Sequence, residues 1–305
     1  MIREEYDYSD VSDYLIKSKS LLIAGYPTKE ERSCYLSEIW KKANLSIIFL
    51  KRCDNGIGNV ECEYVTNGSL QSVIVDLRTE LVGLLRYIGI ESQNVLLDLS
   101  SLDNILIMFL AKQLISEIIP KSFFAAYIRP NKYVQQSGTI GYALCDQVSS
   151  VKAVPGFAKR ISDKQSLYAF LGFDGIRLKN ILETENDIEK FVPIIPFPAG
   201  IPQWYNVTMW NSMDVLQSYS EEVAIRKCFS DSVFEAIELL EREIQNNKPV
   251  VLVPLGTRPH SLACAIFAAN NKDTKIIYDY ITEHEHRAIG VEKITIYHLS
   301  AFLKI

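Results

Sequence analysis

The chain has 305 residues, enough for one large or two modest domains, each able to bury a core of its own. Its hydrophobic content of 48% and its charged content of 23% are those of an ordinary globular protein, and they argue against a chain that is disordered throughout. The formal net charge of −5 argues against a protein that binds nucleic acid through a broad basic face.

The sequence shows neither a targeting signal nor a membrane-spanning segment. The N-terminus MIREEYDYSD is acidic and lacks an apolar signal region. The apolar stretch 105–119 is interrupted by Lys112, Gln113 and Glu117, so no run is long enough to cross a membrane. The six cysteines are scattered without CxxC spacing, which suits reduced, packed thiols. We therefore expect a cytoplasmic protein without a disulfide and without a membrane contact.

Strand and helix patterns alternate along the first half of the chain. Four near-continuous apolar runs predict buried strands, at 20–24, 46–50, 94–99 and 123–128. A weaker alternation at 61–65 predicts an edge strand. Helical spacing of apolar residues predicts three helices, at 28–43, 69–87 and 103–118. Thr28 and Glu31 have the spacing of a capping box, which would start the first of these helices.

A polar segment, rich in Gly and Ser around 135–162, is the predicted connector, after which the same order of elements begins again. Five strands are predicted, at 167–171, 192–198, Val250–Pro254, 275–278 and 294–298. Four helices are predicted, at 176–184, 203–217, 231–246 and from His260 onward.

Buried strands that alternate with helices predict an α/β fold with largely parallel sheets covered by helices. The natural architectures are two Rossmann-like halves, 1–150 and 151–305, or one long doubly wound sheet. In either case a ligand should bind beyond the carboxyl ends of the strands.

The stretch PVVLVPLGTRPHSLACAIFAAN, residues 249–270, is an apolar strand, a tight turn and a small-residue helix in immediate succession. A helix start leaves several backbone N–H groups unpaired beside the positive end of the helix dipole. Gly256 would let the backbone approach a ligand, and Thr257, Arg258 and His260 add donors. The turn therefore predicts a phosphate or carboxylate site, although an ordinary strand-to-helix turn has the same composition.

Further polar and aromatic residues follow the other predicted strands of the second half. Arg177 and Arg258 could hold a phosphate, and Trp204 or Tyr205 could stack on a base. Gly and Asp also populate any turn of this kind, so only their accumulation favours a ligand site. The predicted ligand-binding residues are Gly172, Asp174, Gly175, Arg177, Trp204, Tyr205, Gly256, Thr257, Arg258, His260 and Asp279.

Catalytic signatures are sparse, with no GxSxG, HExxH or Walker A motif. His284 and His286 alternate within EHEHR, but the surrounding charges favour a solvated loop over a metal pair. We therefore predict no metal site. Asp98, at a strand end beside two serines, could serve acid–base chemistry or cap the following helix.

The strand followed by PLGTRPHSLACAIFAAN and KIIYDY resembles the late strand–Gly-Thr–helix–strand element of CARF-type Rossmannoid sensors. In those proteins this turn contacts a cyclic or linear oligonucleotide second messenger. Gly256 and Thr257 match the Gly-Thr element, although Leu255 replaces the first of its usual two glycines. Two such units in one chain are similar to the SAVED arrangement. The resemblance covers roughly the last quarter of the chain and implies a ligand sensor of bacterial anti-phage defence.

The leading hypothesis is a sensor or regulatory subunit that responds to a nucleotide or another phosphate-bearing molecule. It would act through an ATPase or nuclease partner, or through homo-oligomerisation. One alternative is a hydrolase or transferase on a nucleotide or phosphorylated metabolite, with Asp98 or Asp174 as acid or base. The other is a structural subunit that holds an ATPase or nuclease partner and exposes an apolar surface patch. The residues do not indicate a particular cofactor.

Overall fold

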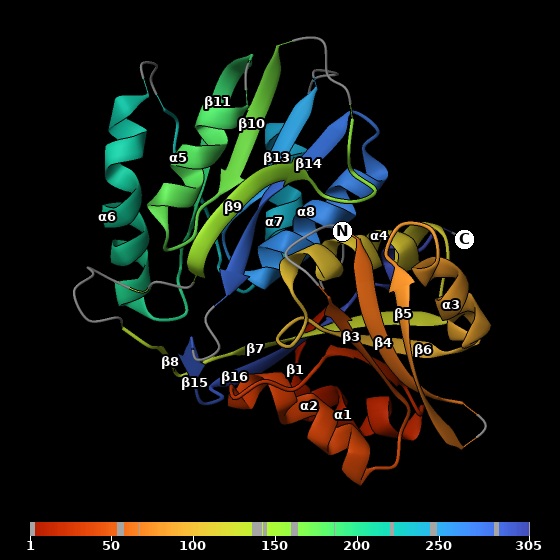
Figure 1. Ribbon diagram of the computed structural model, residues 1–305. Coiled ribbons are helices and arrows are strands. Elements are labelled where there is room, and N and C mark those ends of the chain that lie inside the picture. Colours follow the sequence, from red (N-terminus) through yellow and green to blue (C-terminus); the bar gives the residue numbers. More distant parts are fainter. Residues whose placement is uncertain are drawn as a thin grey trace. The chain divides into compact units, whose positions relative to one another are not determined.

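The chain divides into two α/β units, whose elements are labelled in Figure 1. The computed structural model describes residues 4–53, 58–66, 68–135, 142, 145–159, 164–185, 187–219, 223–244, 249–283 and 287–304, without the side chains of 145–149 and 281–283. One unit comprises Met1–Lys132 and Ala288–Ile305, and the other comprises Tyr133–Arg287. The division expected at residues 150 and 151 differs from this one, because the end of the chain returns to the first unit.

The first unit is built on an eight-stranded sheet in the order β1-β16-β7-β6-β2-β3-β4-β5. Its strands are β1 (Glu5–Asp7), β2 (Leu21–Gly25), β3 (Ile47–Arg52), β4 (Asn59–Thr66), β5 (Ser69–Asp76), β6 (Asn94–Asp98), β7 (Ser122–Arg129) and β16 (Lys293–His298). Strands β7, β6, β2 and β3 are parallel, and the strands outside them pair antiparallel. The strand expected at 294–298 is therefore present, but it pairs with β7 and not with the second half of the chain.

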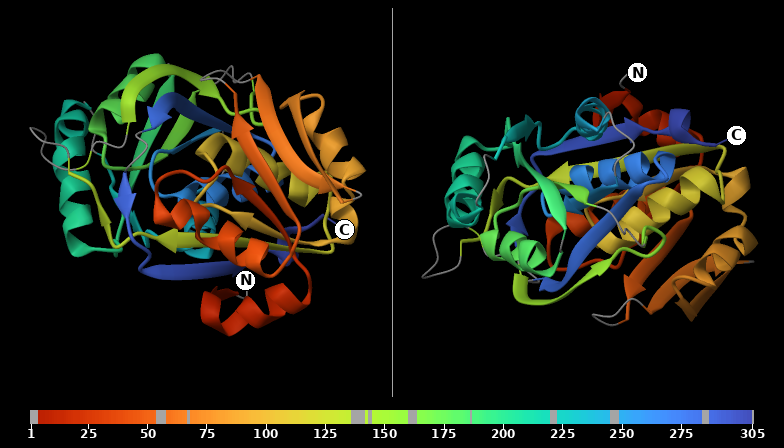
Figure 2. Two further views of the ribbon diagram at one scale, coloured as in Figure 1. Left: turned by 60° about the horizontal axis from the view of Figure 1, so that its bottom comes forward. Right: turned by 90° about the horizontal axis from the view of Figure 1, so that it is seen from above.

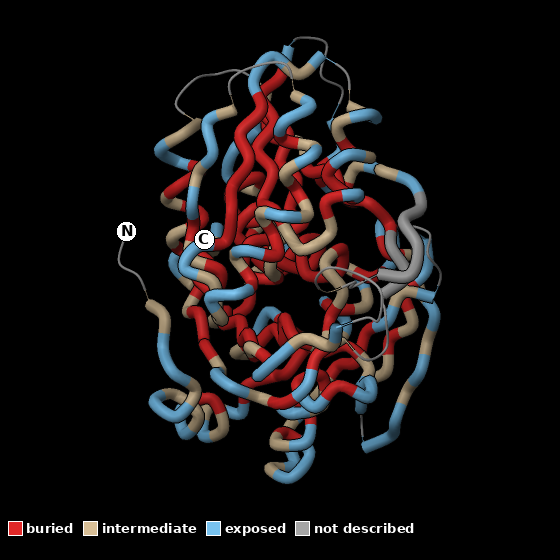
Figure 3. Tube along the Cα trace, turned by 90° about the vertical axis from the view of Figure 1, so that its left-hand side faces the viewer, coloured by how far each residue is buried: buried red, intermediate tan, exposed pale blue. Residues whose placement is uncertain are grey.

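Helices cover the central strands of this sheet on both faces (Figures 1 and 2). They are α1 (Tyr8–Lys17), α2 (Glu31–Lys42), α3 (Leu81–Tyr87) and α4 (Asn104–Ser116). On one face, Leu15 of α1 and Trp40 of α2 pack against Leu22 and Leu96 of the central strands. Strands β2 and β6 have unbroken apolar runs because both of their faces are covered. Buried stretches of the chain are red in Figure 3.

The helix predicted at 69–87 is wrong in its first half. Residues 69–76 form β5, which pairs with β4 along its whole length after a turn at Gly68, where φ is +73°. The helical spacing belongs only to the later residues that form α3, whereas Val73 and Val75 alternate as a strand requires. Strand β4, predicted to lie at the edge, is consequently an inner strand.

The capping box predicted for α2 is also wrong. The helix begins at Glu31 with Glu30 as its N-cap, so Thr28 lies too early to cap it. The Thr28 hydroxyl instead exchanges a hydrogen bond with Ser33 at 2.8 Å and accepts one from the Glu30 amide. Asp103, in contrast, does cap α4, since its carboxylate accepts hydrogen bonds from the amides of Ile105 and Leu106.

The second unit has a six-stranded sheet in the order β12-β11-β10-β13-β14-β9. Its strands are β9 (Cys145–Ala153), β10 (Gln165–Phe170), β11 (Ile188–Pro196), β12 (Arg226–Cys228), β13 (Val250–Pro254) and β14 (Thr274–Glu283), and only β9 is antiparallel to its neighbour. The predicted connector 135–162 lies partly outside the described residues, and its described part contains β9. The prediction that β10, β13 and β6 are buried, parallel inner strands is confirmed.

The connections of this sheet create a topological switch point. Helices α5 (Gly175–Thr184) and α6 (Pro202–Ser218) carry the chain from β10 outward to β11 and β12. Helix α7 (Val233–Glu243) returns it to the other side of β10, and α8 (Arg258–Asn270) follows β13. Helices α5 and α6 cover one face, and α7 and α8 the other (Figures 1 and 2). The direction of travel thus reverses between β10 and β13, where ligands of open α/β sheets bind.

The chain passes between the units at a two-stranded ladder of β8 (Lys132–Tyr133) and β15 (Ala288–Ile289). Within the described residues, no helix is long and apolar enough to cross a membrane. Cys34, Cys53, Cys62, Cys228 and Cys264 are free thiols, and the last three are buried. Burial raises the pKa of Cys264 well above its ordinary value, so this thiol behaves as the small packed hydrophobe that its sequence context predicts.

Candidate functional site

Two loops touch at the switch point, and glycine makes this contact possible. A Cβ atom on Gly172, in the loop after β10, would lie 2.2 Å from the Leu255 carbonyl oxygen after β13. A Cβ on Gly256 would lie 2.9 Å from Nδ1 of His260 and 3.0 Å from the Leu171 carbonyl oxygen. The backbone contact at Gly172 is too short for any larger residue, and the contacts at Gly256 are tighter than a Cβ atom ordinarily makes. The predicted ligand residues Gly172 and Gly256 therefore do lie together, but their glycine character is explained by contact between chain segments.

The turn before α8 is hydrogen-bonded to the neighbouring loops. The Thr257 hydroxyl donates to the Ser230 carbonyl oxygen, and the Ser230 amide donates in turn to the Pro198 carbonyl oxygen. Gly256 and Thr257 are partly exposed, whereas Arg258, the first residue of α8, is only 8% exposed. The turn thus presents an accessible helix start, and its position depends on the loops that follow β11 and β12.

His260, the third residue of α8, is fully buried. Its Nε2 lies 3.0 Å from the Phe229 carbonyl oxygen and must carry the proton, because a carbonyl can only accept. Its Nδ1 has no hydrogen-bond partner among the described residues. Burial lowers the pKa of His260 to about 4. The imidazole is therefore neutral at pH 7, and its N–H is directed into the protein, so it does not supply the donor predicted for a ligand.

The buried His260 should make the stability of the fold depend on pH. Its folded pKa, about 4, lies below its ordinary value of 6.5, so the unfolded chain binds the proton more readily. The stability that the neutral ring contributes is fully present above pH 6.5 and is lost as the pH falls toward 4. The free energy of unfolding should fall by roughly 3 kcal/mol over this range. Urea unfolding of the wild type and His260→Gln at pH 7 and pH 4.5 measures this. The free energy of unfolding of the wild type, relative to that of the variant, should be lower at pH 4.5 than at pH 7. An equal difference at the two pH values would contradict the assignment of a buried, neutral His260.

Arg177 and Asp279 bind each other. The Arg177 Nε donates to one Asp279 carboxylate oxygen at 2.7 Å, and a terminal guanidinium nitrogen donates to the other at 2.6 Å. Both side chains are buried, and the guanidinium lies 5.1 Å from the ring centroid of Tyr278. The two residues therefore join α5 to β14 as a bidentate ion pair. Sequence patterns predict both as ligand-binding residues and do not predict that they bind each other.

Three other predicted ligand residues have structural contacts of their own. Gly175 begins α5, where a Cβ would lie 1.7 Å from the Asn211 carbonyl oxygen of α6. Asp174 is the N-cap residue of that helix and is partly exposed beside Gly172. Trp204 is buried in an aromatic cluster whose other members are Tyr133, Tyr142 and Phe173.

Tyr205 lies apart from the Trp204 cluster. Its ring contacts Phe197 at 5.2 Å between centroids, and the Lys227 amine lies over both rings. Trp204 is thus tied to the loop after β10, whereas Tyr205 faces the ends of β11 and β12.

Asp98 in the first unit belongs to a hydrogen-bond network that connects strand ends. It accepts hydrogen bonds from the Ser100 amide at 2.8 Å and from the Ser101 hydroxyl at 2.7 Å. The Ser101 hydroxyl accepts from the Gly25 amide, and the Ser100 hydroxyl accepts from the Ile128 amide. Asp98 is fully buried, so these contacts connect the ends of β6, β2 and β7 and give it a structural role.

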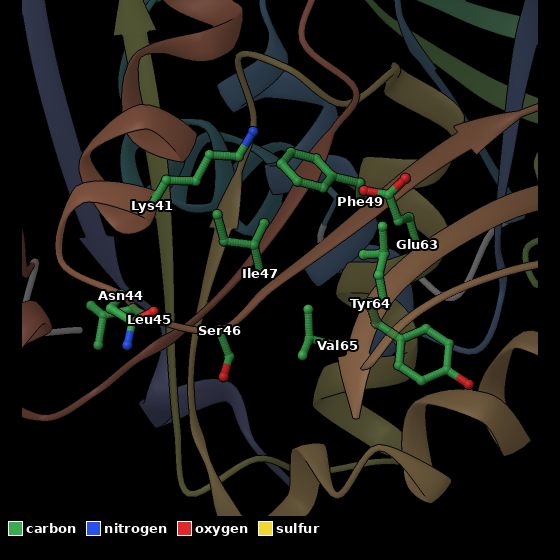
Figure 4. Close-up of a pocket in the computed structure, with 10 residues that line it drawn as sticks. Lys41, Asn44, Leu45, Ser46, Ile47, Phe49, Glu63, Tyr64 and Val65 are labelled. Atoms are coloured by element: carbon green, nitrogen blue, oxygen red, sulfur yellow. The ribbon is translucent and has the colours of Figure 1, made fainter. Parts of the chain in front are cut away.

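The first unit contains a cavity of about 370 Å³ that no sequence pattern predicts (Figure 4). It lies between the end of α2 and strands β3, β4 and β5. The Lys41 amine extends to 5.2 Å from the ring centroid of Phe49, and Glu63 lies beside the same ring. The remaining lining residues are Asn44, Leu45, Ser46, Ile47, Tyr64, Val65 and Leu70. Leu70 joins this lining because β5 pairs with β4, which a helix predicted at 69–87 does not anticipate.

Among the residues that the structure describes, no three His, Cys, Asp or Glu side chains are grouped as metal ligands would be. His284 and His286 lie outside those residues.

Comparisons of this chain with protein-family models, with curated proteins and with solved structures find no match.

Proposed function

We propose that this chain is a cytoplasmic regulatory protein that responds to a small phosphate-bearing ligand, such as a nucleotide, at the start of α8. The observation that carries the proposal is the partly exposed Gly256–Thr257 turn at the β10/β13 switch point. It opens a 13-residue helix, and the positive end of a helix dipole attracts anions to such a turn.

The contacts of the turn suit a sensor better than they suit an enzyme. Gly172 and Leu255 are in backbone contact, so a ligand that moves the α8 turn also moves the loop after β10. The hydrogen bonds from Thr257 and His260 to Ser230 and Phe229 extend the coupling to the loop after β12. A ligand bound at one point can thus bias several loops at once. The resemblance of Gly256 and Thr257 to the CARF Gly-Thr element extends the proposal to an oligonucleotide messenger and to anti-phage defence.

Arg258→Ala should weaken the binding of a nucleotide by about 1.5–3 kcal/mol, roughly a 10- to 150-fold rise in Kd, because a charge-assisted contact is lost. Isothermal titration calorimetry with a panel of mono-, di- and cyclic nucleotides measures the loss. Arg86→Ala is the matched control, since Arg86 is exposed in the first unit and should leave the Kd unchanged. Thermal unfolding of each variant checks that the fold is intact, which matters because Arg258 is mostly buried. Equal affinities for wild type and Arg258→Ala would remove Arg258 from the site.

A structural subunit is the second candidate, and one observation favours it. Val65, Leu70 and Ile74 on the β4–β5 hairpin are 59%, 64% and 65% exposed, which is the kind of apolar surface expected of a protein that holds a partner. If no nucleotide in the panel binds the wild type, this second function replaces the first.

A further inference from the structure

The edge strands of the two large sheets differ in how they are protected against pairing with another chain. Strands β1 and β12 are three residues long and contain charged residues. Strand β9 has nine residues but contains Asp146 and Lys152, and its pairing with β14 is interrupted by two register shifts. Short length, charge and irregular pairing are the usual means of blocking an edge.

Strand β5 has none of these features. It is eight residues long, it pairs with β4 in unbroken register, and its first charged residue is the terminal Asp76. Its exposed face reads Leu70, Ser72 and Ile74, and Leu70 is directly opposite Val65 of β4. An uncharged, regular and apolar edge of this length is a template for another strand.

The sequence of β5 is complementary to itself. Residues opposite each other in an antiparallel pair point to the same face, so two copies related by a two-fold axis at Ser72 would place Leu70 of each opposite Ile74 of the other. Gln71 would face Val73 on the other side of the sheet. A shift of the axis to Val73 would place Leu70 opposite Asp76, and an axis at Gln71 would leave Ile74 beyond the paired residues. Only the Ser72 register matches both exposed apolar side chains.

We propose that β5 is a dimerisation strand, and that a second copy of this chain pairs with it antiparallel about Ser72, which joins the two eight-stranded sheets into one. The two Ser72 side chains then lie opposite each other at the axis, with an apolar pair on either side. This interface is independent of the α8 turn, so it stands whether or not that turn binds a nucleotide.

The symmetry of the pairing supplies its test. A charge at residue 72 meets the same charge in the partner, so Ser72→Lys and Ser72→Glu should each raise the dimer dissociation constant by roughly fivefold or more. An equimolar mixture of the two variants places Lys opposite Glu and should restore the dimer. Sedimentation equilibrium of the full chain over a range of concentrations measures each species. Ser9→Lys, at an exposed position of α1, is the matched control and should dimerise as the wild type does.

Residue 72 is exposed, so both variants should keep the circular dichroism spectrum and melting temperature of the wild type. Three results would overturn the proposal: a wild type that stays monomeric at its highest soluble concentration, a Ser72→Lys variant that dimerises as well as the wild type, or a mixture that stays monomeric while the wild type dimerises. In the first case the β5 face belongs to a partner of another kind.

Discussion

Asp279→Ala should destabilise the protein by about 3–5 kcal/mol, because it leaves the Arg177 guanidinium charged and unpaired in the interior of the second unit. Asp279 is fully buried and the Arg177 side chain is 7% exposed, so water cannot replace the lost partner. The free energy of unfolding, measured in urea by circular dichroism, gives the loss. Most of this loss is the free-energy cost of leaving one charge buried without a partner, and it is not the net stabilisation that the ion pair provides.

A double variant separates these two contributions. Arg177→Met with Asp279→Leu removes both charges and keeps apolar volume, so it should be clearly more stable than Asp279→Ala alone. The control is Glu183→Ala, which breaks the exposed Lys179–Glu183 pair on the same helix α5 and should cost about 0.5 kcal/mol or less. If Asp279→Ala costs no more than this control, the Arg177 guanidinium does not depend on Asp279, and the ion pair is not what holds α5 to β14.

Gly175→Ala should destabilise the second unit by about 3 kcal/mol or more, at the upper limit of overpacking effects. The added Cβ would lie 1.7 Å from the Asn211 carbonyl oxygen, which is backbone and cannot rotate away. Helices α5 and α6 must therefore separate to accept the methyl group. Urea unfolding measures the loss, and a methyl group accepted at little cost would show that the two helices are not in close contact.

Gly83→Ala is the matched control for this substitution. Gly83 lies inside α3, and a Cβ there meets nothing within 4 Å. Alanine should consequently stabilise the helix, by about 0.5–1 kcal/mol, through its higher propensity. If alanine destabilises the protein at Gly175 and stabilises it at Gly83, the effect at Gly175 results from the contact with α6.

The candidate site could be located from the sequence but not described from it. Gly172 and Gly256 follow buried parallel strands, and the carboxyl ends of such strands meet at one edge, so their proximity was predictable. The pairing of Arg177 with Asp279 was not, because the residues are 102 positions apart and no local pattern links them. Whether a polar residue is available to a ligand or is paired with another side chain depends on how the elements pack.

Local sequence patterns are sufficient to predict the α/β class and the inner strands. Unbroken apolar runs such as Val250–Pro254 are stable only with both faces covered, and that requirement acts within a few residues. Residues 69–76 form a strand because of a tertiary contact: their apolar residues suit either a helical or a strand period, and the pairing with β4 selects the strand. It also decided that residues 293–298 join the first sheet, since the partner of a strand depends on contacts between residues far apart in the chain.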